Sequence, residues 1–153
     1  MKRIAVFPGS FDPITRGHES LIRRALDLFD EIIIAVGENP EKKCIFPLDR
    51  RRKWLADVFA GESRIRIELY SGLTVDFCRK MKAGFILRGL RTSADFEFER
   101  SIGQMNRSME PGVETVFLLS EPQYNSLSSS IVRDIFRNGG DVKPFVPEGI
   151  VIR

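Results

Sequence analysis

Cysteine and histidine, the residues most often used for disulfides and metal sites, are scarce in this sequence. The 153 residues include two cysteines and one histidine. Because Cys44 and Cys78 lie far apart and form no CxxC pair, we expect free thiols of the kind found in the reducing cytoplasm. We expect no protein-bound metal, since a metal site needs a cluster of three or four ligands.

Long apolar runs are missing as well. No segment approaches the roughly 18 consecutive apolar residues of a membrane-spanning helix. The first residues, Met1-Lys2-Arg3, lead straight into a short apolar segment of strand character, without the apolar core or the cleavage site of a signal peptide. We therefore expect a cytoplasmic protein with no membrane partner. A hydrophobic share of 42% suffices for one core, so residues 1–153 are expected to form a single domain.

The sequence also lacks two common phosphate-binding motifs, the dinucleotide fingerprint GxGxxG and the P-loop GxxxxGKS/T. Its net charge of +3 permits an anionic partner, but nucleic acids, nucleotides and phosphorylated metabolites all satisfy that charge. A bound phosphate would have to be held by helix N-termini and by cationic side chains from separate segments.

Apolar segments of strand character alternate five times with segments of helical periodicity. The strands are predicted at residues 4–7, 32–36, 65–69, 85–87 and 113–119. The helices are predicted at about residues 21–29, 48–59, 74–82, 94–109 and 128–137. This alternation predicts an α/β fold with a five-stranded parallel sheet and helices on both faces. Ligands of such sheets bind at the carboxyl ends of the strands, so the loops after the strands are the place to look for a site.

The first of these loops joins a strand to a helix and carries Gly9, Ser10, Gly17 and His18. The glycines allow the backbone to approach a ligand closely. His18 falls in the first turn of the helix, where free N–H groups and the helix dipole favour an anion. A lone histidine at a helix start often only caps or packs, but its position directly after this loop favours a role in ligand binding.

The other loops carry cations and hydroxyls that have both structural and functional interpretations. Lys42 on composition alone would be solvated, and Thr74 could simply cap a helix. Arg88 and Arg91 bracket a glycine after the fourth strand, where their planar forks suit phosphate oxygens, although a structural ion pair is the alternative. The serines at 128–130 begin the last helix, where capping and anion binding are compatible.

The basic run Arg50-Arg51-Arg52-Lys53 raises the alternative of a nucleic-acid-binding module. It lies at the start of a predicted helix with Trp54 behind it. A solvated helix face or a subunit contact explains the run better, so no nucleic-acid partner is expected.

Two segments resemble the signatures of the nucleotidyltransferase superfamily. The stretch from Gly9 through Thr15-Arg16-Gly17-His18 resembles the T/HxGH motif, and 127–133 resembles the ISSxxxR motif. In addition, Arg88-Gly89-Leu90-Arg91 followed by 95–99 resembles the RGLRxxxDFEYE signature of the phosphopantetheine adenylyltransferase family. The likeness runs from about residue 2 to about residue 149. Phe98 departs from it by replacing the tyrosine of DFEYE.

The resemblance implies a single Rossmann-like domain that transfers the adenylyl group of ATP to 4′-phosphopantetheine, with Mg²⁺ accompanying the ATP. It implies catalytic roles for His18, Lys42 and Arg91, with His18 stabilising the transition state. Because two anionic reactants repel each other, we expect cations around the reacting centre, and the candidates are His18, Lys42, Arg88 and Arg91. The implied phosphopantetheine-binding residues are Ser10, Lys42, Thr74 and Arg88. The implied ATP-binding residues are Ser10, Phe11, His18, Gly89, Leu90, Arg91, Glu99, Tyr124, Asn125, Ser126, Leu127, Ser128, Ser129 and Ser130.

The resemblance further implies a homohexamer and feedback binding of coenzyme A in the same cleft. Two alternatives stay open at this point. The first is a related adenylyl- or cytidylyltransferase that acts on nicotinamide mononucleotide or glycerol phosphate. The second is a nucleotide sensor without catalysis.

Overall fold

The computed structural model describes all residues 1–153, and its centre is a five-stranded parallel sheet. The strands are β1 (Ile4–Gly9), β2 (Glu31–Gly37), β3 (Ile65–Tyr70), β4 (Phe85–Leu90) and β5 (Glu114–Leu119). They lie in the order β3-β2-β1-β4-β5, and every neighbouring pair is parallel. The predicted α/β fold is confirmed.

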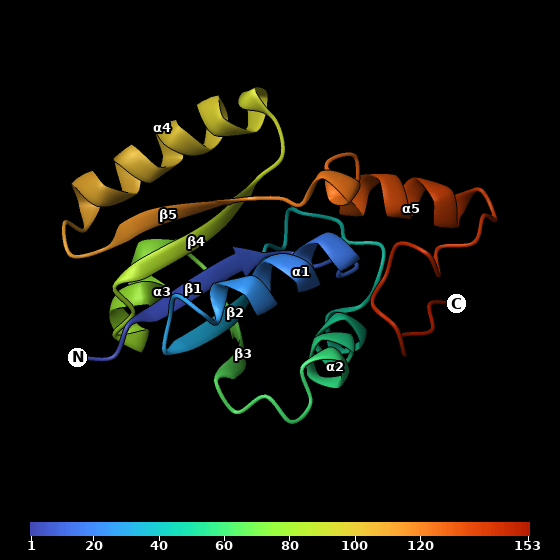
Figure 1. The fold of residues 1–153 in the computed structure, drawn as a ribbon, viewed down its shortest axis with the longest axis horizontal. Coiled ribbons are helices and arrows are strands. Elements are labelled where there is room, and N and C mark those ends of the chain that lie inside the picture. The colour runs from blue at the N-terminus through green and yellow to red at the C-terminus, as the bar shows by residue number, and fades with distance from the viewer.

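Five α-helices and one 3-10 turn connect and cover the strands. They are α1 (Arg16–Ala25), α2 (Leu48–Val58), α3 (Thr74–Met81), α4 (Ser93–Met109), η1 (Pro122–Tyr124) and α5 (Ser129–Arg137). Helices α1 and α2 lie on one face of the sheet, and α3 lies on the opposite face (Figure 1). Helix α4 runs beside β4 and β5, as its contacts with these two strands also show.

The sheet buries side chains on both faces, which explains the continuous apolar character of β2. Along this strand Ile32 and Ile34 belong to the core beneath α1 and α2, whereas Ile33 and Ala35 belong to the core beneath α3. A strand with helices on both faces has no polar side, so its sequence shows no alternation. The larger core holds 18 buried residues and the smaller one nine, which places most of the burial between the sheet and α1 and α2.

Most boundaries lie within two residues of the sequence-based prediction, and the larger differences concern β4 and α1, which ends at Ala25 rather than at residue 29. Strand β4 continues to Leu90, so Arg88, Gly89 and Leu90 lie in the strand, and only Arg91 lies beyond it. The strand extends because its backbone pairs with β5 as far as Leu119, a pairing that apolar periodicity does not reveal. Helix α1 begins at Arg16, five residues before its first buried apolar residue, because a capping box at Thr15 starts it early.

The strand order reverses between β1 and β4. Going along the chain, the sheet grows from β1 through β2 to β3, whereas β4 and β5 add on the other side of β1. The loops at the carboxyl ends of β1 and β4 therefore part from each other, which leaves an opening for a ligand.

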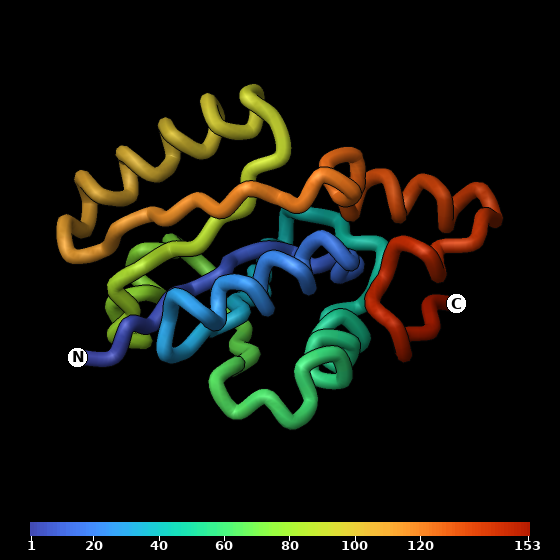
Figure 2. Tube along the Cα trace, in the orientation of Figure 1, coloured from blue at the N-terminus to red at the C-terminus, as the bar shows by residue number.

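The chain folds back after α5 toward α2, as the trace in Figure 2 shows. Val142 and Val146 of this segment pack against Val132 of α5. Arg16, in the first turn of α1, donates from Nε to the Val146 carbonyl at 2.8 Å, and its backbone N–H donates to the Phe145 carbonyl at 2.9 Å. The segment thus supports the starts of both α1 and α5. None of the helices is both long enough and apolar enough to cross a bilayer.

Candidate functional site

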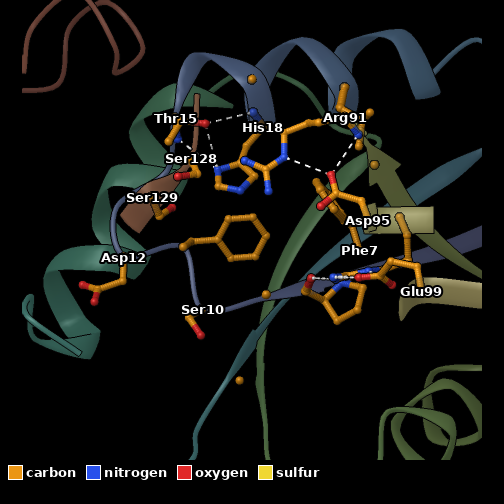
Figure 3. A pocket seen from close by; sticks show the side chains of 18 of the residues that line it. Phe7, Ser10, Asp12, Thr15, His18, Arg91, Asp95, Glu99, Ser128 and Ser129 are labelled. Carbon is orange, nitrogen blue, oxygen red and sulfur yellow. Dashed lines mark hydrogen bonds and ion pairs between the residues drawn. The ribbon is translucent and has the colours of Figure 1, made fainter. Parts of the chain in front are cut away.

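A cleft of about 680 Å³ opens at the carboxyl ends of the strands. All five loops that follow strands contribute to its lining, with Ser10, Lys42, Thr74, Arg91 and Ser128 as one example from each. Figure 3 shows its side chains converging from α1, from the first loop and from the ends of the strands. The cleft lies at the reversal of strand order, where the fold predicts a ligand site.

His18 is held at the start of α1 by a reciprocal hydrogen-bond pair with Thr15. The Thr15 hydroxyl accepts from the His18 backbone N–H at 3.3 Å, and His18 Nδ1 accepts from the Thr15 backbone N–H at 3.0 Å. Because Nδ1 acts as the acceptor, the proton of the neutral ring lies on Nε2. The remaining N–H donor of the imidazole is therefore free for a ligand in the cleft (Figure 3).

His18 is not one of the cations of the site, which corrects the sequence-based interpretation. Desolvation of the ring, together with the positive charges of Arg88 and Arg91, lowers the pKa of His18 from 6.5 to about 4. The imidazole is thus neutral at pH 7 in the ligand-free protein. It acts as a hydrogen-bond donor of fixed direction, and the positive charge of the site comes from lysine and arginine.

Two aromatic rings pack against the imidazole of His18. The ring centroid of Phe11 lies 5.1 Å from that of His18, and the centroid of Phe7 lies 6.3 Å away, both in edge-to-face arrangements. Phe11 is 3% exposed and its backbone has a φ of 48°, in the left-handed region that costs a non-glycine residue about 1 kcal/mol or more. Phe11, which is predicted to contact ATP, thus lines the cleft with a largely buried ring that packs against the histidine.

The serine triplet begins α5 at the rim of the same cleft. Ser128 is the N-cap residue, and its Oγ accepts from the Ile131 N–H at 3.2 Å. Ser129 Oγ donates to the Pro13 carbonyl at 2.8 Å, which ties this helix start to the first loop. The hydroxyls of both residues thus act within the protein, whereas the backbone N–H groups of Ser129 and Ser130 make no hydrogen bond to it.

Arg88 points into the cleft from β4 but is already engaged by the protein. Its Nε and Nη2 donate to the two carboxylate oxygens of Glu99 at 2.9 and 2.7 Å, and Nη1 donates to the Pro8 carbonyl at 2.8 Å. The structural ion pair weighed as the alternative is therefore present. It does not exclude phosphate binding, because a guanidinium has five N–H donors and three are used here.

Arg91 follows the end of β4 and bridges α4 to the serine segment. Its Nε lies 3.3 Å from a carboxylate oxygen of Asp95, and its Nη1 donates to the Leu127 carbonyl at 3.1 Å. Asp95 also completes a capping box with Thr92 at the start of α4. These contacts direct the guanidinium of Arg91 toward the α5 start.

The predicted acceptor-binding residues Ser10, Lys42, Thr74 and Arg88 all line the cleft. Lys42 Nζ donates to Ser10 Oγ at 2.6 Å, so this lysine is not simply solvated. The hydroxyls of Thr74 and Tyr70 are 3.0 Å apart, and Thr74 does not cap its helix, whose N-cap residue is Leu73. Tyr70 was absent from the sequence-based prediction because one tyrosine at a strand end carries no distinguishing pattern.

The remaining predicted ATP-binding residues divide into two groups. Gly89, Glu99, Tyr124 and Leu127 line the cleft with the residues already described. A side chain at Gly89 would come within 3.3 Å of Leu21, so this glycine also permits close packing of α1 on β4. Leu90, Asn125 and Ser126 do not line the cleft.

Three buried or half-buried charged residues near the site were missed or misinterpreted. Asp12 is 3% exposed, and its carboxylate accepts from the backbone N–H groups of Ile45 and Phe46, both at 2.9 Å. Arg133 donates to the Asp12 carbonyl at 2.9 Å. The run 50–53 was assigned to a solvated helix face or a subunit contact, but Arg51 is 6% exposed. A solvated face was wrong for this one residue, because a basic run gives no indication of which member turns inward.

The side chains alone form no metal-binding cluster, since no three His, Cys, Asp or Glu residues come together. The two cysteines are free, with Cys44 half-buried and Cys78 buried. Desolvation raises the pKa of the Cys78 thiol to about 11, so this group stays protonated and unreactive at neutral pH.

Known proteins resemble the chain in sequence and in fold. A family model described as cytidylyltransferase-like matches residues 6–135. The phosphopantetheine adenylyltransferase of Flavobacterium psychrophilum is 50% identical over 151 residues, with 99% of both chains covered. The protein of the same name from Christiangramia forsetii is 52% identical over 144 residues, covering 94% of this chain and 95% of that one.

Among solved structures, a bifunctional NMN adenylyltransferase/ADP-ribose pyrophosphatase from Francisella tularensis matches with a TM-score of 0.72. Its sequence identity is 20%, and the match covers 98% of this chain and 46% of that one, so the likeness concerns the fold. Taken together with the motifs that meet in the cleft, the full-length identity of about one half shows that the chain belongs to the phosphopantetheine adenylyltransferase family of nucleotidyltransferases.

Proposed function

We propose that this protein transfers the adenylyl group of ATP to 4′-phosphopantetheine, giving dephospho-coenzyme A and pyrophosphate, a step of coenzyme A biosynthesis. The observation that carries the proposal is the 50% identity, over 99% of both chains, to relatives named phosphopantetheine adenylyltransferase. The cleft supports it, because helix starts, hydroxyls and cations suited to two phosphate-bearing substrates line a single cavity.

ATP is assigned to the part of the cleft between the starts of α1 and α5. The free N–H groups of Ser129 and Ser130 and the helix dipole favour the β- and γ-phosphates there. Arg91, which already reaches the Leu127 carbonyl, adds positive charge beside them. The α-phosphate would then lie toward His18, whose Nε2–H is the fixed donor of the site.

Phosphopantetheine is assigned to the part of the cleft around Ser10, Lys42, Thr74 and Arg88. Two cations and two hydroxyls are present there, and the phosphate of the acceptor carries between one and two negative charges near neutral pH. Placing this phosphate between Lys42 and Arg88 brings its oxygens next to the α-phosphate side of the ATP site. The arrangement offsets the repulsion between two anionic reactants.

The chemistry then needs no protein nucleophile. A phosphate oxygen of the acceptor attacks the α-phosphorus of ATP, a new O–P bond forms, and the bond from that phosphorus to the bridging oxygen of pyrophosphate breaks. Pyrophosphate leaves with the electron pair. His18 donates a hydrogen bond to the α-phosphate as charge develops, and Lys42 and Arg91 stabilise the entering and leaving groups.

A divalent cation fits this scheme as part of the ATP, and we propose Mg²⁺. No cluster of three acidic, histidine or cysteine side chains is available to hold the ion, so the phosphates of the nucleotide would supply most of its ligands. When bound, the ion neutralises charge on the pyrophosphate that leaves. The Francisella tularensis protein of the same fold was crystallised with AMP and a manganese ion.

The family resemblance also leads us to propose a homohexamer that works in the cytoplasm and binds coenzyme A in the same cleft. Met105 and Met109 of α4 are 62% and 46% exposed, and such apolar side chains on a helix surface suit a subunit contact. Light scattering tests the assembly, and competition between coenzyme A and ATP tests the feedback binding.

The direct test of the activity mixes the protein with ATP, Mg²⁺ and 4′-phosphopantetheine and detects dephospho-coenzyme A by mass spectrometry. A panel with nicotinamide mononucleotide and glycerol phosphate, each with ATP and CTP, measures selectivity through pyrophosphate release. The proposal is supported if turnover occurs only when phosphopantetheine is the acceptor and ATP is the nucleotide. Turnover only with another acceptor would refute it, and absence of turnover with all of them would favour a nucleotide sensor.

A further inference from the structure

Arg51 is a buried cation that forms no ion pair. It comes from α2 and is 6% exposed, and no carboxylate lies within 4.0 Å of its guanidinium. Its partners are two backbone carbonyls: Nη1 donates to Ser10 at 2.7 Å, and Nε donates to Phe46 at 3.0 Å. Burying an arginine costs several kcal/mol of hydration free energy. The adjacent Arg52 of the same helix is exposed and avoids this cost. We therefore expect the burial of Arg51 to bring a compensating benefit.

Asp12 links the same two loops through hydrogen bonds of its own. It belongs to the first loop, and its carboxylate accepts the N–H groups of Ile45 and Phe46 at the end of the second loop. Together, Arg51 and Asp12 engage both the N–H and the carbonyl of Phe46. The Phe46 ring is fixed in turn, with Trp54 and Phe136 at centroid distances of 5.1 and 5.2 Å.

These hydrogen bonds link the two loops whose side chains form the contact between Lys42 and Ser10. Ser10 lies in the first loop and Lys42 in the second, and Lys42 Nζ donates to Ser10 Oγ at 2.6 Å. Lys42 itself is exposed and belongs to a loop without regular structure, where its backbone N–H donates to the Asn39 carbonyl of the same loop at 3.0 Å. The nearest rigid anchor of its loop is the backbone around Phe46, held by Asp12 and Arg51.

We propose that Arg51 and Asp12 are positioning residues, which act through Ser10 and Lys42 to set the geometry of the acceptor phosphate. The inference rests on the proposed function, because it takes Ser10 and Lys42 to bind phosphopantetheine. Neither positioning residue needs to touch a substrate. In the nucleotide part of the cleft, neither the α1 start nor the α5 start makes a hydrogen bond to Arg51, whose partners are the carbonyls of Ser10 and Phe46. Loss of Arg51 should therefore affect the two substrates unequally.

The test compares Arg51→Met with Arg52→Met in steady-state kinetics. Both substitutions remove one positive charge from adjacent positions of α2, but Arg52 is exposed. For R51M we expect kcat/KM for phosphopantetheine to fall by about 30-fold, within the range for misplacement of a binding group by about 1 Å. The Kd of ATP, measured by calorimetry without acceptor, should change less than about twofold, and R52M should match wild type throughout.

A double-substitution cycle tests whether Arg51 acts through the lysine. If it does, adding Arg51→Met to Lys42→Met should lower kcat/KM by much less than the product of the two separate losses, because coupled residues are not additive. If R51M does not fold, Arg51→Lys and Asp12→Asn provide the same comparison. Lysine keeps the charge without the fork, and asparagine keeps the shape but offers one acceptor in place of two.

The outcomes separate this inference from the proposed function. If wild-type protein does not convert ATP and phosphopantetheine, the proposed function is wrong and the positioning role falls with it. If wild type is active and R51M has unchanged phosphopantetheine kinetics, the positioning role alone is refuted. It is refuted as well if R51M weakens ATP and phosphopantetheine equally, or if its losses multiply fully with those of Lys42→Met, since either result indicates a general structural defect.

Discussion

The starts of α1 and α5 face the same cleft, but they use their first backbone N–H groups differently. At α1 the N–H of Arg16 donates to Phe145 and that of His18 to Thr15, so only the Gly17 N–H lacks a protein partner. At α5 the N–H groups of Ser129 and Ser130 both lack one. We call the α1 start closed, because two of its first three N–H groups are bonded within the protein. We call the α5 start open, because only the third, that of Ile131, is bonded.

This difference indicates that the two helix starts have different roles in the reaction. The closed start of α1 fixes the imidazole of His18 in one tautomer and one direction, which suits a donor aimed at charge that develops during reaction. The open start of α5 offers backbone donors and the helix dipole, which suit a phosphate bound in the ground state. Substitutions at the two starts should therefore affect different kinetic constants.

The largest effect is expected for His18→Ala. Loss of one preorganised donor should lower kcat by about 100-fold or more. The Kd of ATP should rise only modestly, because the open start of α5 stays intact. Single-turnover kinetics together with calorimetry separate these quantities. Near-normal turnover of this variant would show that the closed start has no part in the reaction.

Arg88→Ala should have the next largest effect and should concern the acceptor. Removing a charge-assisted contact of about 1.5–3 kcal/mol should raise the KM for phosphopantetheine by about 10- to 100-fold. Glu99→Gln, which weakens the two bonds that orient Arg88, should raise the same KM by a smaller factor. An unchanged acceptor KM in R88A, or a larger effect of Glu99→Gln on ATP, would contradict these assignments.

Ser129→Pro tests the open start of α5 directly. Proline fits the first position of a helix and removes one of the two free N–H groups there, and Ser128 already has the extended backbone that a following proline requires. We expect the Kd of ATP to rise by about 10-fold, as for one charge-assisted hydrogen bond. Ser129→Ala is the matched control, because it removes the hydroxyl but keeps the N–H. Equal effects of the two substitutions would rule out a role for the backbone donor.

The smallest expected effect at neutral pH is the titration of His18. As the sole histidine, it gives an unambiguous NMR signal, and its midpoint in the free protein should lie near 4 rather than 6.5. Between these values the unfolded chain binds a proton that the folded chain does not, so stability should decrease as the pH falls from about 6.5 to about 4. Arg91→Met should raise the midpoint by removing one positive charge. A wild-type midpoint near 6.5 would show that the ring is solvated.

The sequence predicted the sheet well, because the central strands β1 and β2 are buried and read as apolar runs, whereas β3 alternates apolar with polar side chains. Segments such as 32–36 have no competing interpretation in a chain with five strand–helix alternations. The end of β4 was missed, because Arg88 and Gly89 break the apolar run while their backbone still pairs with β5. Hydrogen bonding between strands is not visible in residue type.

The candidate site was predicted less completely than the sheet. Motifs identified which loops face the cleft, and the structure brings His18, Arg91 and the serine triplet together there. They did not reveal that His18 is neutral, since its pKa depends on desolvation, on Arg88 of β4 and on Arg91 just after that strand. Nor did they reveal that Arg51 turns inward, because its partners are backbone carbonyls of residues distant along the chain.

The most direct test of the central claim is a crystal structure with an ATP analogue whose α,β-bridging oxygen is replaced by methylene. We predict the α-phosphate within hydrogen-bond distance of His18 Nε2, and the β- and γ-phosphates at the N–H groups of Ser129 and Ser130. A triphosphate that contacts only one of the two helix starts, or that binds outside the cleft, would contradict it.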